Sequence, residues 1–255
     1  MNDAAGAKSG IVTAAVLVIG DEILSGRTKD RNIGYIAEYL TNIGIDLREV
    51  RVVPDIEDDI VAALNAVRHR YTYVFTTGGI GPTHDDITAD SVAKAFGVPI
   101  GVDPRARALL LTRIAEKDLN EARLRMARIP LGADLILNKV SAAPGFRIGN
   151  VHVMAGVPTI MQAMLDEVAP TLKTGIRMLS DSVRADLREG DIGGPLGEIA
   201  KAHPEVMIGS YPFQEDGRAN TNVVVRSRDR AKLAAAKAAV EEMLARVRAG
   251  LRQTA

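Results

Sequence analysis

The segment from residue 76 to residue 88 combines residue types that are suited to phosphate chemistry. Glycines stand at positions 78, 79 and 81, after the apolar run 73–75, and the acids Asp85 and Asp86 follow them. Glycine lets a backbone come close to a ligand, and backbone N–H groups at a turn into a helix bind phosphate. Carboxylates repel phosphate and are better suited to holding a bridging divalent metal ion or to moving a proton. This segment, named here the glycine loop, predicts a site for a phosphorylated ligand; the alternative is a tight acidic turn that binds nothing.

Three further loops of this kind follow apolar runs that are typical of strands. They contain Gly20 with Asp21 and Glu22, then Asp55, and then Gly156 with Pro158. In α/β proteins, ligands bind at the carboxyl ends of parallel strands, so we expect these loops to meet the glycine loop at one edge of a sheet. Each acid also has a simpler explanation, because Asp55 can begin a helix and Glu22 can be surface charge.

The elements that must position these loops alternate along the chain. The expected strands are residues 14–19, 45–53, 73–77, 135–137 and 151–154, and the expected helices begin near residues 31, 57, 88, 104 and 158. Residues 14–19 are apolar throughout, as in a strand that is buried on both faces. Ile33, Ile36 and Leu40 form one helical stripe. The alternation predicts an α/β fold with a mainly parallel sheet and helices on both faces.

The pattern changes near residue 173, which predicts a small C-terminal α+β unit. There we expect a strand at 176–179, a helix at 195–203, a hairpin of strands 206–211 and 222–227 joined by a long loop, and a final helix. The expected domains are therefore residues 13–172 and 173–255, after a disordered leader over residues 1–12.

Composition excludes several classes of function. Lys plus Arg equals Asp plus Glu, at 32 each, which argues against a sequence-independent grip on nucleic acid. The chain has no cysteine, so thiolate and Fe–S chemistry are excluded. No apolar run approaches the ~20 residues of a membrane span, so we expect a cytoplasmic protein with no membrane partner. The dinucleotide-binding, P-loop and zinc-hydrolase motifs are all missing.

Two other groups of residues have mainly structural interpretations. Met161 and Met164 are expected to pack in the core. The arginines between positions 105 and 128, Arg125 among them, are expected to form a solvated helix face, the alternative being that one or two of them reach a bound phosphate.

The glycine loop resembles the molybdopterin-binding (MoaB/Mog) domain. More closely, the chain resembles the version found in competence/damage-inducible protein A and at the front of eukaryotic FAD synthases. The resemblance rests on Thr77-Gly78-Gly79-Ile80-Gly81-Pro82-Thr83-x-Asp85-Asp86-Ile87-Thr88 and on three further segments, which begin at Gly20, Asn138 and Gly156.

The resemblance implies a role for two aspartates. In Mog-type domains, two aspartates serve the transfer of adenylate to molybdopterin, and by motif position they fall on Asp55 and Asp86. The competence-protein branch is linked instead to metal-dependent cleavage of pyrophosphates such as ADP-ribose or FAD. Mog enzymes usually carry arginine where Asp85 stands here, and this additional carboxylate favours metal-assisted chemistry.

The resulting hypothesis is a divalent-metal-dependent nucleotide pyrophosphatase. Its alternatives are a non-catalytic molybdopterin-binding module and a molybdopterin adenylyltransferase. We expect catalytic roles for Asp86, Asp55 and Asp85, and Mg²⁺ or another divalent ion held by Asp85, Asp86 and Glu22. The expected ligand-binding residues are Gly20, Glu22, Thr77, Gly78, Gly79, Gly81, Pro82, Thr83, Thr88, Gly156 and Pro158. The partner is a small nucleotide or pterin, and the family resemblance implies a homo-oligomer, either a dimer or a trimer.

Overall fold

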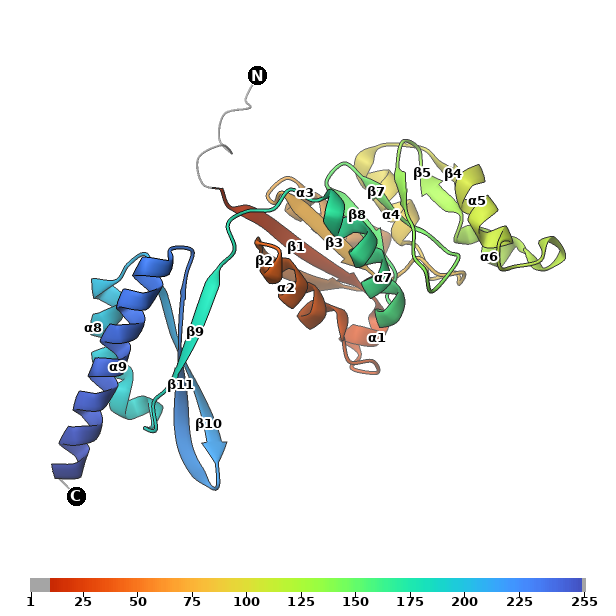
Figure 1. The fold of residues 1–255 in the computed structure, drawn as a ribbon. Coiled ribbons are helices and arrows are strands. Elements are labelled where there is room, and N and C mark those ends of the chain that lie inside the picture. Colours follow the sequence, from red (N-terminus) through yellow and green to blue (C-terminus); the bar gives the residue numbers. More distant parts are fainter. Residues whose placement is uncertain (1–9, 254–255) are drawn as a thin grey trace. The chain divides into compact units, whose positions relative to one another are not determined.

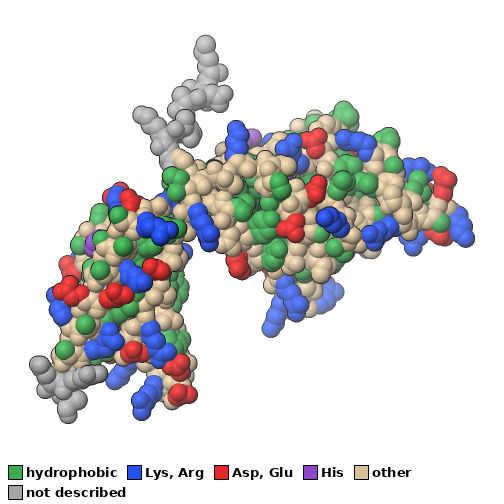
Figure 2. All heavy atoms as spheres, viewed as in Figure 1, with side chains coloured by type: hydrophobic (Ala, Val, Ile, Leu, Met, Phe, Trp, Pro, Cys, Tyr) green, Lys and Arg blue, Asp and Glu red, His purple; other side chains and the backbone are tan. Residues whose placement is uncertain are grey.

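The computed structural model describes residues 10–253. The chain forms two compact units, and the boundary along the sequence lies between Gly175 and Ile176. Most of the expected leader lies outside the described residues, and Val12 already belongs to the first strand. No helix in the described part of the chain is long and apolar enough to cross a membrane. On the face shown in Figure 2, Lys and Arg side chains are interspersed with Asp and Glu side chains over both units.

The larger unit contains a mixed, mostly parallel sheet in the strand order β2-β1-β3-β8-β7-β6 (Figure 1). Its strands are β1 (Val12–Ile19), β2 (Ile45–Val53), β3 (Tyr73–Thr77), β8 (Val151–Met154), β7 (Gly145–Ile148) and β6 (Asp134–Ile136). Strands β2, β1, β3 and β8 run parallel, while β7 and β6 continue the sheet in antiparallel fashion. The expected α/β class is confirmed.

Helices cover both faces of this sheet. The larger unit contains α1 (Asp21–Leu24), α2 (Asn32–Asn42), α3 (Glu57–Arg68), α4 (Thr88–Phe96), α5 (Pro104–Leu111), α6 (Glu121–Arg125) and α7 (Pro158–Val168), with a short ribbon of β4 (Ile100–Val102) and β5 (Arg128–Pro130). Successive side chains of β1 alternate between the two cores: Leu17 packs with the buried residues of α3 and α4, and Val16 packs with those of α2 and α7. The continuous apolar run in β1 therefore serves two cores at once.

The smaller unit is an antiparallel three-stranded sheet with two helices. Its elements are β9 (Leu179–Arg184), α8 (Glu189–Ala202), β10 (Met207–Glu215), β11 (Arg218–Ser227) and α9 (Arg230–Gln253), and the strand order is β10-β11-β9. Buried residues of α8, α9 and β11, including Ile192, Val223 and Val240, share one core.

Three expectations for the smaller unit are wrong. The strand expected at residues 176–179 lies further along the chain, as β9 (Leu179–Arg184). The predicted long hairpin loop is absent from this part of the structure, because β10 and β11 continue to a tight turn at Asp216 and Gly217. Both residues have positive φ, at 49° and 74°, which is the backbone of a two-residue hairpin turn. Helix α8 also begins six residues before Pro195, at Glu189. Ile192 and Leu196 lie four positions apart and both enter the core, and this burial outweighs the poor helix propensity of the intervening glycines.

Candidate functional site

The glycine loop connects β3 to α4, and its first two glycines are required by close packing. Gly78 and Gly79 have φ of 102° and 65°. A Cβ on Gly78 would lie 2.1 Å from the carbonyl oxygen of Ile19, at the end of β1. A Cβ on Gly79 would lie 2.2 Å from Oγ1 of Thr88. The loop therefore lies directly against the ends of neighbouring elements, as a glycine-rich ligand loop does.

Thr88 fixes the shape of this loop from the first turn of α4. Its Oγ1 donates to the carbonyl of Gly78 at 2.9 Å, and its backbone N–H donates to the carbonyl of Gly79 at 3.0 Å. The side chain is fully buried. The structure thus places Thr88 behind the loop, where it holds the two glycines. Thr77 is also buried and belongs to β3.

Asp86 is held by Thr83 within the same loop. Its Oδ2 accepts hydrogen bonds from the backbone N–H of Thr83 at 2.8 Å and from the Thr83 hydroxyl at 2.5 Å. Gly81 lies against this carboxylate, since a Cβ there would be 2.6 Å from Oδ2. Asp85 is exposed, with the imidazole of His84 at 4.0 Å from its carboxylate. Hydrogen bonding by the Thr83 side chain lowers the pKa of Asp85, so Thr83 lies beside both acids. Asp86 is the acid that accepts two hydrogen bonds from Thr83.

Acids from the neighbouring strand ends approach the glycine loop. The carboxylate of Asp55, just after β2, accepts a hydrogen bond from the backbone N–H of Asp21 at 2.9 Å. Burial raises the pKa of Asp55, and the negative charges of Asp21, Glu22 and Asp85 raise it further. A Cβ on Gly20 would lie 2.5 Å from a carboxylate oxygen of Glu22, so Glu22 folds back over Gly20. Acids from three strand-end loops therefore interact electrostatically with one another.

The loop after β8 packs against the glycine loop from the other side. Nδ2 of Asn32, at the start of α2, donates to the carbonyl of Gly156 at 2.8 Å. A Cβ on Gly156 would be 3.2 Å from the Cα of Gly78, so the two loops touch through their glycines. Pro158 begins α7 as its first residue, a position where its missing N–H costs nothing.

A cavity of about 380 Å³ opens between these loops; we name it the ligand pocket. Its size is within the range of small-molecule sites. Of the predicted site residues, it is lined by Glu22, Gly78, Gly79, Gly81, Pro82, Asp86 and Gly156. The other predicted residues do not line it: Gly20, Asp55, Thr77, Thr83, Asp85, Thr88 and Pro158 lie around the pocket or behind its walls.

Several lining residues were not predicted from the sequence. They are Ile80, Met126, Ser141, Ala143, Ala155, Val157, Ile160 and Met164. Met164 is buried in the core as expected, yet it also reaches the pocket, and its sulfur accepts a hydrogen bond from the N–H of Ala155 at 3.4 Å. The segment containing Ser141 follows Asn138, a position that carried part of the family resemblance, and this was the available signal.

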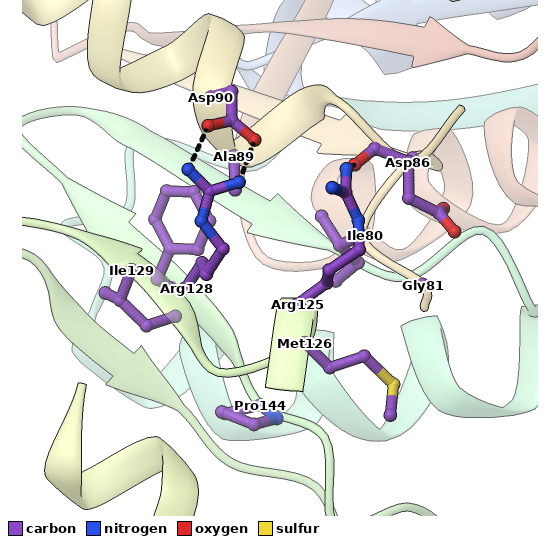
Figure 3. Close-up of a pocket in the computed structure, with 12 residues that line it drawn as sticks. Ile80, Gly81, Asp86, Ala89, Asp90, Arg125, Met126, Arg128, Ile129 and Pro144 are labelled. Atoms are coloured by element: carbon purple, nitrogen blue, oxygen red, sulfur yellow. Dashed lines mark hydrogen bonds and ion pairs between the residues drawn. The ribbon is translucent and has the colours of Figure 1, made fainter. Parts of the chain in front are cut away.

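A smaller hollow shares five lining residues with the ligand pocket. Figure 3 shows the residues that line this hollow. We name it the arginine hollow, because Arg125 and Arg128 line it together with Asp90 and Pro144. The guanidinium of Arg128 forms a bidentate pair with the carboxylate of Asp90, at 2.6 and 2.9 Å. Nη2 of Arg125 instead donates to the backbone carbonyl of Asp86, at 3.0 Å. Figure 3 shows the Asp86 carboxylate turned away from Arg125.

The acids of the site fit a hard divalent cation in their chemistry but do not enclose one. Among residues 10–253, no three acidic or histidine side chains form a group that could hold a metal ion. Glu22, Asp85 and Asp86 therefore do not make a complete metal site by themselves. Mg²⁺ is commonly bound by one or two carboxylates together with substrate phosphates and water, and that mode agrees with acids that line an open pocket.

Comparison with known proteins agrees with the α/β fold of the larger unit and with the division into two units. Residues 15–174 match the family model described as the probable molybdopterin binding domain, and residues 177–249 match the FAD synthase middle domain. A crystal structure of a CinA protein of unknown function from Thermoplasma acidophilum is 35% identical, with a TM-score of 0.60, and the match covers 64% of this chain and 99% of that one.

Relatives extend this similarity over nearly the whole chain. A protein of Aeropyrum pernix is 31% identical, and the match covers 94% of this chain and 94% of that one. A probable FAD synthase of Caenorhabditis briggsae is 29% identical, and the match covers 91% of this chain but 49% of that protein. The chain thus spans about half of that synthase. The present chain belongs to the family of the probable molybdopterin binding domain, and in this chain an FAD synthase middle domain follows that domain.

Proposed function

We propose that this chain binds a nucleotide containing a pyrophosphate and hydrolyses it with the help of a divalent metal ion, with ADP-ribose and FAD as the expected substrates. The observation that carries the proposal is the lining of the ligand pocket. The glycine loop and the carboxylates of Glu22 and Asp86 belong to the same cavity. A polyanion beside two carboxylates requires a cation between them, because like charges repel at short range.

The rest of the pocket suits the ring system of such a nucleotide. Met126, Ile160 and Met164 supply apolar surface, and Ser141 supplies a hydroxyl. Binding sites for small molecules typically combine a mostly apolar lining with a few polar groups that fix orientation. A base, flavin or pterin ring can therefore lie on the apolar side while its phosphates reach the glycine loop.

The acids differ in what they do for the reaction. Glu22 and Asp86 both line the pocket, and Asp86 is the one that Thr83 preorganises to face the ligand. Asp55 acts at a distance: its hydrogen bond to the N–H of Asp21 holds the turn that carries Glu22. A bound divalent ion would supply neutralisation of phosphate charge and a water of lowered pKa.

The test is hydrolysis by the purified full chain in Mg²⁺, Mn²⁺ or Co²⁺. Water adds across the P–O–P bond, so FAD should yield AMP and FMN, and ADP-ribose should yield AMP and ribose 5-phosphate. Asp86→Asn retains an oxygen for the Thr83 hydrogen bonds but loses the charge, and we expect a rate loss of about 10²-fold or more. Asp59→Asn, at an exposed position on α3, is the matched control and should keep the wild-type rate.

A second function is favoured by the absence of a closed metal cluster among the described residues. This second function is non-catalytic binding: the domain holds molybdopterin, or its adenylated form, without turnover. Wild-type protein that cleaves neither nucleotide with any of the three metals, yet binds molybdopterin in metal-free buffer, would establish this alternative and rule out the pyrophosphatase.

A further inference from the structure

Arg125 stands out among the charged groups around the glycine loop because it has no carboxylate partner among the described residues. Its neighbour Arg128 is fully engaged by Asp90. The interaction that Arg125 makes is with a neutral acceptor, the backbone carbonyl of Asp86. A partly buried cation is costly unless its charge is matched, and here the exposed carboxylate of Asp85 attracts Arg125 without forming an ion pair with it.

One donor of the Arg125 guanidinium is also unused. Nη2 is taken by the Asp86 carbonyl, whereas Nε is buried and has no hydrogen-bond partner. Buried donors in folded proteins are nearly always paired, so an unpaired one beside a cavity indicates a missing acceptor. Arginine presents its donors in a planar fork that matches phosphate oxygens.

The position of Arg125 indicates that this acceptor would belong to a ligand bound at the glycine loop. Arg125 lines the arginine hollow, which shares Gly79, Ile80, Gly81, Asp86 and Met126 with the ligand pocket. The hollow has a volume of about 10 Å³. This is close to the minimum space that a single water-sized group occupies. An oxygen that projects from a ligand on the glycine loop would fit there, beside the Arg125 side chain.

We propose that Arg125 is a phosphate-binding residue. Its guanidinium donates a hydrogen bond to one pyrophosphate oxygen of the nucleotide, while its Nη2 continues to donate to the Asp86 carbonyl. The proposal rests on the proposed function for the class of ligand, but it concerns binding and does not require turnover. By joining the anion to the backbone of Asp86, Arg125 would also order the loop around the bound ligand.

The experiment measures binding to the full chain by calorimetry, first in metal-free buffer and then with Mg²⁺, with ADP-ribose, inorganic pyrophosphate and adenosine as probes. Arg125→Gln should weaken ADP-ribose and pyrophosphate by about 10- to 100-fold, the range expected for a lost charge-assisted hydrogen bond. Adenosine carries no phosphate, so its affinity should not change. Arg125→Lys keeps the charge without the fork and should fall between the two.

The matched control is Arg123→Gln, an exposed arginine of the same short helix that donates to the backbone carbonyl of Asp118. It should bind all three probes like the wild type. If Arg125 only supported the loop, Arg125→Gln would weaken adenosine as much as ADP-ribose, and that result overturns the proposal. Unchanged ADP-ribose affinity in Arg125→Gln, or no binding of ADP-ribose and pyrophosphate by the wild type, also overturns it. A wild type that binds ADP-ribose through Arg125 but does not cleave it refutes the pyrophosphatase alone.

Discussion

At the scale of single residues, the central sheet contains a histidine in an apolar environment. His152 on β8 is 2% exposed, and its ring stacks on Phe75 at a centroid distance of 5.2 Å, with Tyr73 at 5.8 Å. Burial lowers the pKa of His152 from 6.5 to about 4. The histidine is therefore neutral in the folded protein at pH values where it begins to take up a proton in the unfolded chain.

This difference predicts a loss of stability in mild acid. The folded pKa is depressed, so the contribution is complete above about pH 6.5 and is lost as the pH falls toward 4, by at most about 3 kcal/mol. Urea unfolding at pH 7 and pH 5, followed by tyrosine fluorescence, measures it, since every tyrosine except Tyr211 lies in the larger unit. His152→Gln should lose less stability between the two pH values than the wild type. The exposed His84→Gln should behave like the wild type, and a matching decrease in all three proteins would refute the assignment to His152.

Sequence reasoning found the residues of the site that lie close together along the chain. The glycines and Asp86 share one loop, and residue type alone indicates what such a loop can do. It did not find Met126 or Ser141, and it gave Arg125 mainly a solvent-facing role. Met126 and Ser141 line the ligand pocket and Arg125 lines the arginine hollow, all from segments that only tertiary packing brings to the glycine loop. Periodicity places a residue on a helix face but does not say which distant loop that face meets.

At the scale of elements, two glycines with positive φ flank helix α4: Gly79 in the glycine loop before it and Gly97 at its C-terminal cap. Gly79 lies before the helix with φ of 65°, and Gly97 caps it with φ of 66°. A Cβ on Gly97 would meet nothing within 4 Å, whereas one on Gly79 would meet Thr88 Oγ1 at 2.2 Å. Positive φ is unfavourable for alanine at both positions, and only Gly79 adds a clash.

We expect Gly97→Ala to cost about 1–2 kcal/mol of stability, the usual penalty of a left-handed residue that carries a Cβ. Gly79→Ala should cost about 1–3 kcal/mol more, because the Thr88 hydroxyl must move and give up its hydrogen bond to the Gly78 carbonyl. Urea unfolding of the two variants gives the difference directly, and equal costs would show that the Thr88 contact is not a constraint. Calorimetry with ADP-ribose should show weaker binding for Gly79→Ala only.

Elements were predicted best where one local signal decided them. Strands buried on both faces, such as β1, follow from continuous apolar runs, and α5 begins where Asp103 and Pro104 predict a cap. The errors lie in the smaller unit, where local and tertiary signals disagree. Glycines and Pro195 argued against the first turns of α8, and the burial of Ile192 and Leu196 prevailed. The Asp216-Gly217 turn is a two-residue signal inside a polar stretch whose composition is typical of a loop.

At the scale of the whole molecule, each of the two units has its own hydrophobic core. Among residues 10–253, no buried core residue belongs to both units. Two clusters lie on opposite faces of the large sheet, and a third lies in the smaller unit around Val223, Val240 and Leu244. The site residues all come from the larger unit. Packing energy is local, because a cavity loses the contacts of the atoms that line it. Damage to one core should therefore stay within its own unit.

Hydrogen exchange of two core variants tests this independence. Leu244→Ala and Leu64→Ala each empty a fully buried position, one in the smaller unit and one beneath the large sheet, and each should cost about 2–5 kcal/mol locally. Amide exchange should rise in β9, β10 and β11 for Leu244→Ala while β1 and β3 stay protected, and the pattern should reverse for Leu64→Ala. ADP-ribose affinity should fall only in Leu64→Ala, because α3 packs directly under β1 and the loops that leave the sheet. Faster exchange across both units in either variant would mean that they unfold as one cooperative body.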